Sequence, residues 1–215
     1  MVLRRRLEGR WLQILTHLAA LLPLARLGWD YGQNLFLVDP VREITTRTGK
    51  TALILLLLSL ACTPIGTVLG FKEVRRVRRA LGIYAFIYAG LHGLTFVGLD
   101  YGFDLALIRE AIFHQRYVLA GSAAFALLLP LAITSTRGWQ KRLGKHWKRL
   151  HRLAYLAGVL AVVHFVWLVK DIREPLRYVA VLALLLAVRI PAIRRAVSHT
   201  RRRFRAQISR TRSSN

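Results

Sequence analysis

Three of the seven histidines lie in or beside long apolar segments, where an imidazole without a partner is energetically costly. His92 lies inside one such segment. The stretch KRLHRLAYLAGVLAVVHFVW at 148–167 carries His151 at its basic start and His164 deep inside it. A single histidine of this kind is most simply explained by a hydrogen bond to a neighbouring helix. For three together, their relative depth decides between helix packing and the binding of a cofactor.

His92 and His164 are predicted to lie at similar depth in two helices that run in the same direction. These helices begin near residues 80 and 150, each just after a basic segment, so His92 lies about 18 Å and His164 about 21 Å along its axis. Two imidazoles at one depth on facing helices can hold a flat iron macrocycle between them as axial ligands. We therefore predict that His92 and His164 bind haem iron, toward the end away from the basic segments.

Each of these two histidines ends a stripe of small side chains at helical spacing. The stripes consist of Ala89, Ala85 and Gly82 before His92, and of Ala161, Ala157 and Ala154 before His164. Small residues at this spacing are also typical of closely packed membrane helices. Because both stripes end at depth-matched histidines, we interpret them as space for a porphyrin.

His151 is predicted to lie at the opposite, basic end, where the helix that carries His92 has no second histidine. Arg78 lies at that level, fourteen residues before His92 and on the same helix face. His151 either binds a second haem, with an unusual or absent second ligand, or has another role. We expect Arg78 to bind a haem propionate or a lipid phosphate rather than iron. A thirteen-residue step turns an ideal helix by about 220°, so His151 and His164 share a face only if the helix is tilted or kinked.

The remaining histidines and the single cysteine have simpler explanations. His146 and His199 lie in basic polar segments, and His17 is expected to make a structural hydrogen bond in the first helix. His114 lies in an amphipathic stretch that we expect at the membrane surface. Cys62 is the only cysteine, which excludes an internal disulfide and a cysteine-ligated iron–sulfur cluster.

The composition is both apolar and basic, with 54% hydrophobic residues and a net charge of +24 over 215 residues. A soluble nucleic-acid-binding protein would explain the charge but not the apolar segments, whereas a membrane protein explains both. We predict an all-α integral membrane bundle, a single domain over 1–195, followed by a basic tail at 196–215 that contacts anionic lipid. The six predicted helices span 11–27, 51–70, 80–98, 117–136, 151–169 and 177–193.

The charges predict how this bundle is oriented. Six spans place both termini on one side, together with the loops at 71–79 and 137–152. That side carries 25 of the 34 Lys and Arg residues and only two of the ten acids, Glu8 and Glu73. The positive-inside rule makes this side, and therefore both termini, cytoplasmic.

Two segments resemble a known family. RRALGIYAFIYAGLHGLTFVGLD at 78–100 and LAITSTRGWQKRLGKHWKRLHRLAYLAGVLAVVHF at 131–165 are similar to the MsrQ family, the haem-binding membrane subunits of bacterial MsrPQ methionine-sulfoxide reductase systems. That family belongs to the wider ferric-reductase-like transmembrane family. The resemblance covers essentially the whole chain, although two-haem ferric reductases typically carry two histidines in the helix that here carries His92.

The resemblance implies a function. The protein would bind haem b, as one or two groups, through His92, His151 and His164, and would use FMN. It would take electrons from the quinone pool or from a cytoplasmic flavin reductase. It would pass them across the bacterial inner membrane to a periplasmic molybdopterin-containing subunit similar to MsrP. Methionine sulfoxide in damaged periplasmic proteins would be reduced on that partner and not on this chain.

Two other classes of function compete with this one. The first is a stand-alone transmembrane reductase similar to ferric reductases or to cytochrome b561. The sequence argues against it, because no GxGxxG or other nucleotide-binding fingerprint follows the last helix. This chain would therefore need an outside electron donor. The second is a transporter or scaffold, for which acidic residues well inside the spans are missing.

Overall fold

A computed structural model describes residues 2–36 and 39–190 of the protein, and every segment of regular structure in this part is helical. The predicted basic tail at 196–215 lies outside the described residues. The α-helices are α1 (Val2–Gly32), α2 (Pro40–Pro64), α3 (Arg78–Thr95), α4 (Leu105–His114), α5 (Arg116–Ile133), α6 (Arg137–Leu143), α7 (Lys145–Leu150), α8 (Leu153–Leu168) and α9 (Arg173–Ala187). Short π-helical turns at Ile65–Leu69 and Phe96–Asp100 extend α2 and α3, and a 3₁₀ turn occupies Lys72–Arg76.

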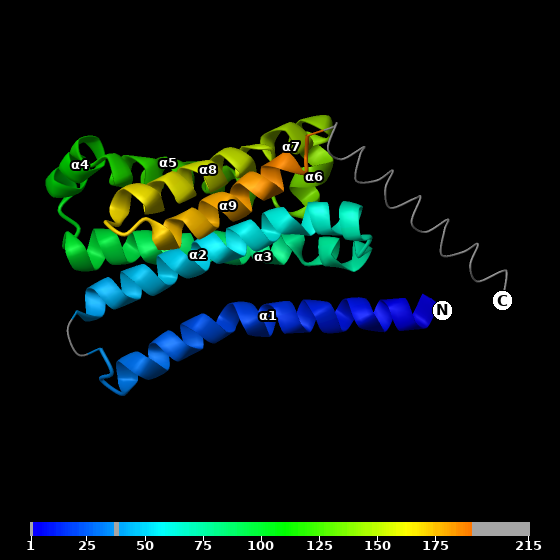
Figure 1. The fold of residues 1–215 in the computed structure, drawn as a ribbon, viewed down its shortest axis with the longest axis horizontal. Coiled ribbons are helices and arrows are strands. Elements are labelled where there is room, and N and C mark those ends of the chain that lie inside the picture. The colour runs from blue at the N-terminus through cyan, green and yellow to red at the C-terminus, as the bar shows by residue number, and fades with distance from the viewer. Residues whose placement is uncertain (1, 37–38, 191–215) are drawn as a thin grey trace.

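The long helices lie side by side and alternate in direction (Figure 1). The start of α1, the connection from α2 to α3, and the short helices α6 and α7 lie at one end of the bundle. The connection from α1 to α2 and the helix α4 lie at the other end. The basic loops thus gather at one end, which we call the basic end, and the loops that carry eight of the ten acids lie at the other, which we call the outer end. This arrangement supports the predicted sidedness, but which end is cytoplasmic stays a prediction.

Helix α2 is the centre of the bundle. Five of the described helices are long and apolar enough to cross a membrane. In the most apolar stretch of α2, 56% of the residues are buried, whereas in that of α1 only 11% are. Leucines of α2 pack against α8 and α9 in one buried cluster, which comprises Leu53, Leu57, Leu60, Val162, Phe165 and Leu182. Because lipid tails are as apolar as leucine, close packing rather than water exclusion holds such helices together.

The start of α2 corrects the sequence prediction. We expected a helix from residue 51 and an outer loop before it, but α2 begins at Pro40 after an Asp39 cap that accepts from the Arg42 N–H. Charged residues in the first three turns masked this part of the helix. They are paired in the structure: Arg47 contacts Asp30 at the end of α1, and Lys50 Nζ lies 2.9 Å from Glu174 Oε2 on α9. The early start matters because it brings Thr45 and Gly49 into the bundle.

The first helix is bent where a tyrosine side chain enters its hydrogen-bond ladder. Tyr88 of α3 is buried, and its hydroxyl donates to the Ala20 carbonyl and accepts from the Leu24 N–H. In an unbroken helix these two backbone groups would bond to each other. Pro23 favours a bend at the same turn. Tyr88 therefore joins α3 to α1 at the turn where the backbone hydrogen bonds of α1 are interrupted.

The sixth predicted span is shorter than expected in the described part of the chain. We predicted a helix over 177–193, and α9 runs from Arg173 to Ala187, which is 15 residues. It is not among the five helices that satisfy the length and composition of a membrane span. Residues 191–193 of the predicted span lie outside the described residues, so the count of six spans stays a prediction.

Candidate functional site

The structure brings His92 and His164 together between α3 and α8. Their ring centroids lie 5.9 Å apart, and the ring planes are nearly perpendicular, at 82°. The two residues are 72 positions apart in the sequence, and parallel helices with matching depth account for their meeting. The depth argument therefore predicted this pairing in space.

Each imidazole is held by a backbone carbonyl of a neighbouring helix. His92 Nδ1 lies 2.9 Å from the Thr45 oxygen of α2, and His164 Nδ1 lies 2.6 Å from the Tyr117 oxygen of α5. A carbonyl oxygen only accepts hydrogen bonds, so each Nδ1 carries the proton in the neutral ring and Nε2 keeps its lone pair. Metal-binding histidines are typically oriented in this way.

A glycine lies under each ring, one helical turn after the carbonyl that the ring contacts. A Cβ on Gly49 would lie 2.9 Å from His92 Nδ1, and a Cβ on Gly121 would lie 2.7 Å from His164 Nδ1. Neither contact is possible for a real side chain without moving the ring. Glycine therefore lets the imidazole lie flat against the neighbouring helix.

The two half-sites correspond to each other in the sequence. In both, the histidine comes 47 residues after the carbonyl that it contacts. The glycine under the ring is four residues after that carbonyl in each case. The pair α2–α3 and the pair α5–α8 therefore build the same arrangement twice, and the two copies face each other.

The small-residue stripes lie between these helix pairs. Ala85 and Ala157 are fully buried in one cluster, and Ala89, Ala154 and Ala161 pack against it. Both stripes therefore lie at the centre of the bundle, where α3 packs mainly against α2 and α8 mainly against α5. The interpretation as porphyrin space rests on the histidines above the stripes and stays a prediction.

His151 lies in a turn at the basic end, away from the other two histidines of the predicted set. We expected it at the first residue of a helix over 151–169, but α7 ends at Leu150 and α8 begins at Leu153. The helical rotation of about 220° between His151 and His164 consequently does not apply, because the helix is interrupted after His151.

The His151 ring is fixed by two neighbours. It stacks on Trp147, with centroids 4.1 Å apart, and its Nε2 lies 3.2 Å from Thr134 Oγ1. The Thr134 hydroxyl already donates to the Pro130 carbonyl, so His151 Nε2 carries the proton that it donates to Thr134. A metal bound at Nε2 of His151 would have to replace this hydrogen bond. In His92 and His164 the hydrogen bond is made by Nδ1, so a metal at Nε2 would replace none.

Arg78 lies at the basic end, as predicted, at the first position of α3. Its side chain is half-buried, and Nη1 donates to Thr63 Oγ1 at 3.1 Å. It is close enough to His151 for their charges to interact.

The remaining described histidines are at the surface of the bundle. His17, His114 and His146 are exposed, and His17 hydrogen-bonds the Tyr84 hydroxyl at 2.9 Å, as expected for a structural role. His199 lies outside the described residues.

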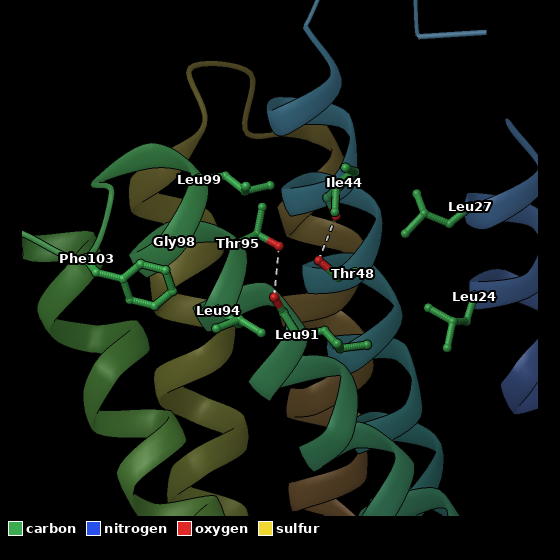
Figure 2. A pocket seen from close by; sticks show the side chains of 10 residues that line it. All are labelled: Leu24, Leu27, Ile44, Thr48, Leu91, Leu94, Thr95, Gly98, Leu99 and Phe103. Carbon is green, nitrogen blue, oxygen red and sulfur yellow. Dashed lines mark hydrogen bonds between the residues drawn. The ribbon is translucent and has the colours of Figure 1, made fainter. Parts of the chain in front are cut away.

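An apolar pocket of about 350 Å³ opens beside this site, between the outer half of α1 and helices α2 and α3 (Figure 2). Leu24 and Leu27 of α1 face Thr48, Leu91 and Thr95 across it. The two threonine hydroxyls donate to carbonyls of their own helices, so they offer no free proton to a ligand. None of the three candidate histidines lines this pocket.

Sequence reasoning missed five residues that hold the site. Thr45 and Tyr117 contribute backbone atoms, which no side-chain pattern reveals, and Thr134 contacts His151 only through the fold. The glycines were visible in principle, because Gly49 and Gly121 each precede their histidine by 43 residues. That equal spacing was the available signal.

The comparisons with known proteins identify the family of the chain. A family model described as the ferric reductase like transmembrane component matches residues 48–169, which include all three candidate histidines. A protein of Xanthomonas axonopodis pv. citri named protein-methionine-sulfoxide reductase heme-binding subunit MsrQ is 49% identical over 183 residues, 82% of this chain and 84% of the relative. A protein of the same name from Rhodospirillum rubrum is 46% identical over 191 residues, 85% of this chain and 89% of the relative.

The apolar helices and the matched family model define a multi-pass membrane protein. The chain belongs to the ferric-reductase-like transmembrane family and, within it, to the MsrQ proteins.

Proposed function

We propose that this chain binds haem b and carries electrons to a separate subunit that reduces methionine sulfoxide. The names of its MsrQ relatives support both parts of this proposal. The observation that carries it is the His92–His164 pair, whose rings lie 5.9 Å apart, each with Nδ1 held by a backbone carbonyl. That arrangement leaves two Nε2 lone pairs for one metal ion.

The described residues fit an axial pair of haem ligands. A ring separation of 5.9 Å suits one metal ion between two imidazoles, each bound at about 2 Å. The carbonyls of Thr45 and Tyr117 fix the tautomer, and Gly49 and Gly121 give the rings their positions. When bound, the haem supplies a one-electron carrier whose potential depends on its ligands and on the polarity around it.

The chain's own contribution is orientation and exclusion of water. The helices around the pair are apolar and pack closely, so they would keep water away from a bound haem. We place this haem toward the periplasm, where the predicted MsrP-like molybdopterin subunit would collect electrons. Reduction of the sulfoxide would then occur on that partner.

The basic end is the predicted entry point for electrons. The donor would be the quinone pool or a cytoplasmic flavin reductase, with FMN as a further cofactor. His151 either binds a second haem or has another role there, and Arg78 binds an anionic group of a cofactor or lipid. The inner membrane of a bacterium is the predicted location.

The competing functions make different demands. A stand-alone reductase would show haem but no need of a periplasmic partner. A transporter or scaffold would show neither haem nor a redox partner, and its histidines would serve packing or proton binding.

A spectrum of the purified protein tests the proposal. Protein from cells supplied with a haem precursor is solubilised in detergent, and haem is quantified per chain as the pyridine haemochrome, oxidised and dithionite-reduced. We expect a sharp b-type α-band and at least one haem per chain. Reoxidation of that band by an added MsrP-like subunit would distinguish an electron-transfer subunit from a stand-alone reductase. A colourless protein would contradict the proposal.

A further inference from the structure

Two half-buried arginines from distant parts of the chain converge on one section of α2 at the basic end. Arg78, at the start of α3, donates to Thr63 Oγ1 at 3.1 Å. Arg189, which follows α9, donates to the Leu60 carbonyl and to the Tyr155 hydroxyl. Leu60 and Thr63 are three residues apart, so they are neighbours on one face of the helix, about 4.5 Å apart along its axis.

A proline explains why Arg189 binds at this place. The Leu60 carbonyl would normally accept from the N–H four residues later, but that residue is Pro64, which has none. Arg189 supplies the missing donor. Its guanidinium carbon also lies 4.2 Å from the centroid of the Tyr155 ring, so α2, α8 and the end of α9 are joined by one side chain.

These contacts fix the position of Arg189 but leave its charge unbalanced. The Leu60 carbonyl, the Tyr155 hydroxyl and the Tyr155 ring are all neutral. Arg189 Nε is buried and has no hydrogen-bond partner among the described residues. Buried charges in proteins are normally paired, because an unpaired one loses its hydration without compensation.

No described carboxylate lies within ion-pair distance of either arginine. The ion pairs among the described residues join Asp30 to Arg26 and Arg47, Glu43 to Arg47, and Glu174 to Lys50, near the outer end. The sequence offers little compensation, since Glu8 and Glu73 are the only acids on the side that carries 25 basic residues. Arg78 is moreover close enough to Arg189 and to His151 for their charges to interact, so positive charge is concentrated beside the inner histidine.

We infer that Arg78 and Arg189 together form a binding site for the oxyanion of a redox cofactor at the basic end of the bundle. The inference rests on the proposed function and adds Arg189, the half-buried position of the charge, and the chemical class of the ligand group. Two cofactors of the proposed function carry such a group, the phosphate of FMN and the propionates of haem. Guanidinium groups bind both kinds of oxyanion through paired N–H donors.

The test compares each cofactor with a neutral analogue. In purified full-length protein, we measure binding of FMN and of riboflavin, which lacks the phosphate, by flavin fluorescence. In parallel, we measure the rate at which haem b and haem dimethyl ester, which lacks free propionates, leave the protein for apomyoglobin. The variants are Arg189→Gln, Arg78→Gln and Arg189→Lys, with Arg152→Gln as the control, because Arg152 is exposed at the same end.

The two sources give different results. If the site holds the flavin phosphate, Arg189→Gln and Arg78→Gln lower FMN affinity about 10-fold or more, leave riboflavin unchanged, and leave haem loss unchanged. If it holds a propionate, the same variants accelerate loss of haem b about 10-fold while haem dimethyl ester is lost at the wild-type rate. Arg189→Lys keeps the charge and retains part of the effect, and Arg152→Gln behaves as wild type.

Two results would overturn the inference. One is that both glutamine variants bind all four ligands as wild type does. The other is that they lose the charged and the neutral ligand of a pair equally, because this indicates that the arginines only hold the helices in place. Failure of the proposed function is distinguishable, since then the wild-type protein itself binds neither haem nor flavin.

Discussion

The ring of His164 lies directly against Gly121, with no room for a Cβ between them. A Cβ at Gly121 would lie 2.7 Å from Nδ1 and 3.0 Å from Cε1 of the ring. The same relation joins His92 to Gly49 on the opposite helix pair. The position of each ring therefore depends on the glycine beneath it as well as on the hydrogen bond from Nδ1 to the backbone carbonyl.

Gly121→Ala and Gly49→Ala should accordingly weaken haem binding without removing a ligand. The added methyl group displaces the ring from the carbonyl that orients it, and loss of such an orienting contact typically lowers metal affinity 10- to 100-fold. The measurement is the rate of haem loss to apomyoglobin.

Gly93→Ala is the matched control for both glycine variants. Gly93 follows His92 directly on α3, and a Cβ there would meet nothing within 4 Å. We expect haem retention equal to wild type. Equal haem loss from Gly93→Ala and Gly121→Ala would show that contact with the ring is not the cause.

His151→Ala should leave the outer haem intact. His151 lies in the turn between α7 and α8, stacked on Trp147, and makes no contact with the His92–His164 pair. We expect the bis-imidazole spectrum to persist while haem per chain either stays the same or falls by one. A fall would assign a second haem to His151, and loss of all haem would contradict the separation of the two levels.

Tyr88→Phe should destabilise the packing of α1. The variant removes the hydroxyl that bridges Ala20 and Leu24, and unpaired buried backbone groups cost about 1–3 kcal/mol. The measurement is the thermal unfolding midpoint in detergent. Tyr84→Phe is the control, since its hydroxyl contacts the exposed His17, and a midpoint as low as that of Tyr88→Phe would argue against the bridge.

The number of spans can be tested by the position of the C-terminus. At 1.5 Å per residue, α9 is about 22 Å long, shorter than a hydrocarbon core of about 30 Å, so it needs further helical residues after Ala187 to cross. We expect a C-terminal green fluorescent protein fusion to fluoresce, as it does in the cytoplasm. An active C-terminal alkaline phosphatase fusion would instead place the nine basic residues after Val188 outside the cell, against the positive-inside rule.

Apolar segments and helical spacing predicted the parts of the fold that depend on local sequence. The helical class, the positions of the central helices and the meeting of His92 with His164 follow from residue type and axial rise. The start of α2 was not predicted, because Arg42, Glu43 and Arg47 resemble a loop until their partners are known.

The remaining features of the site depend on tertiary contacts. His151 lies outside α8 because the chain turns after Leu150, and nothing in the basic stretch around His151 marks that turn. Arg189 was not singled out by the sequence. Its contact with Leu60, 129 residues earlier, exists only because Pro64 leaves a carbonyl free on a helix that folds against it.

The most direct test of the central claim is the electron paramagnetic resonance spectrum of the oxidised protein, recorded for wild type, His92→Ala, His164→Ala and His17→Ala. Two axial imidazoles make the iron low-spin, so we predict a low-spin signal in wild type and in His17→Ala. In His92→Ala and in His164→Ala this signal should vanish, with haem lost or converted to high spin, while the protein still inserts in the membrane. Full haem content with an unchanged low-spin signal in both variants would show that these two histidines do not hold the iron.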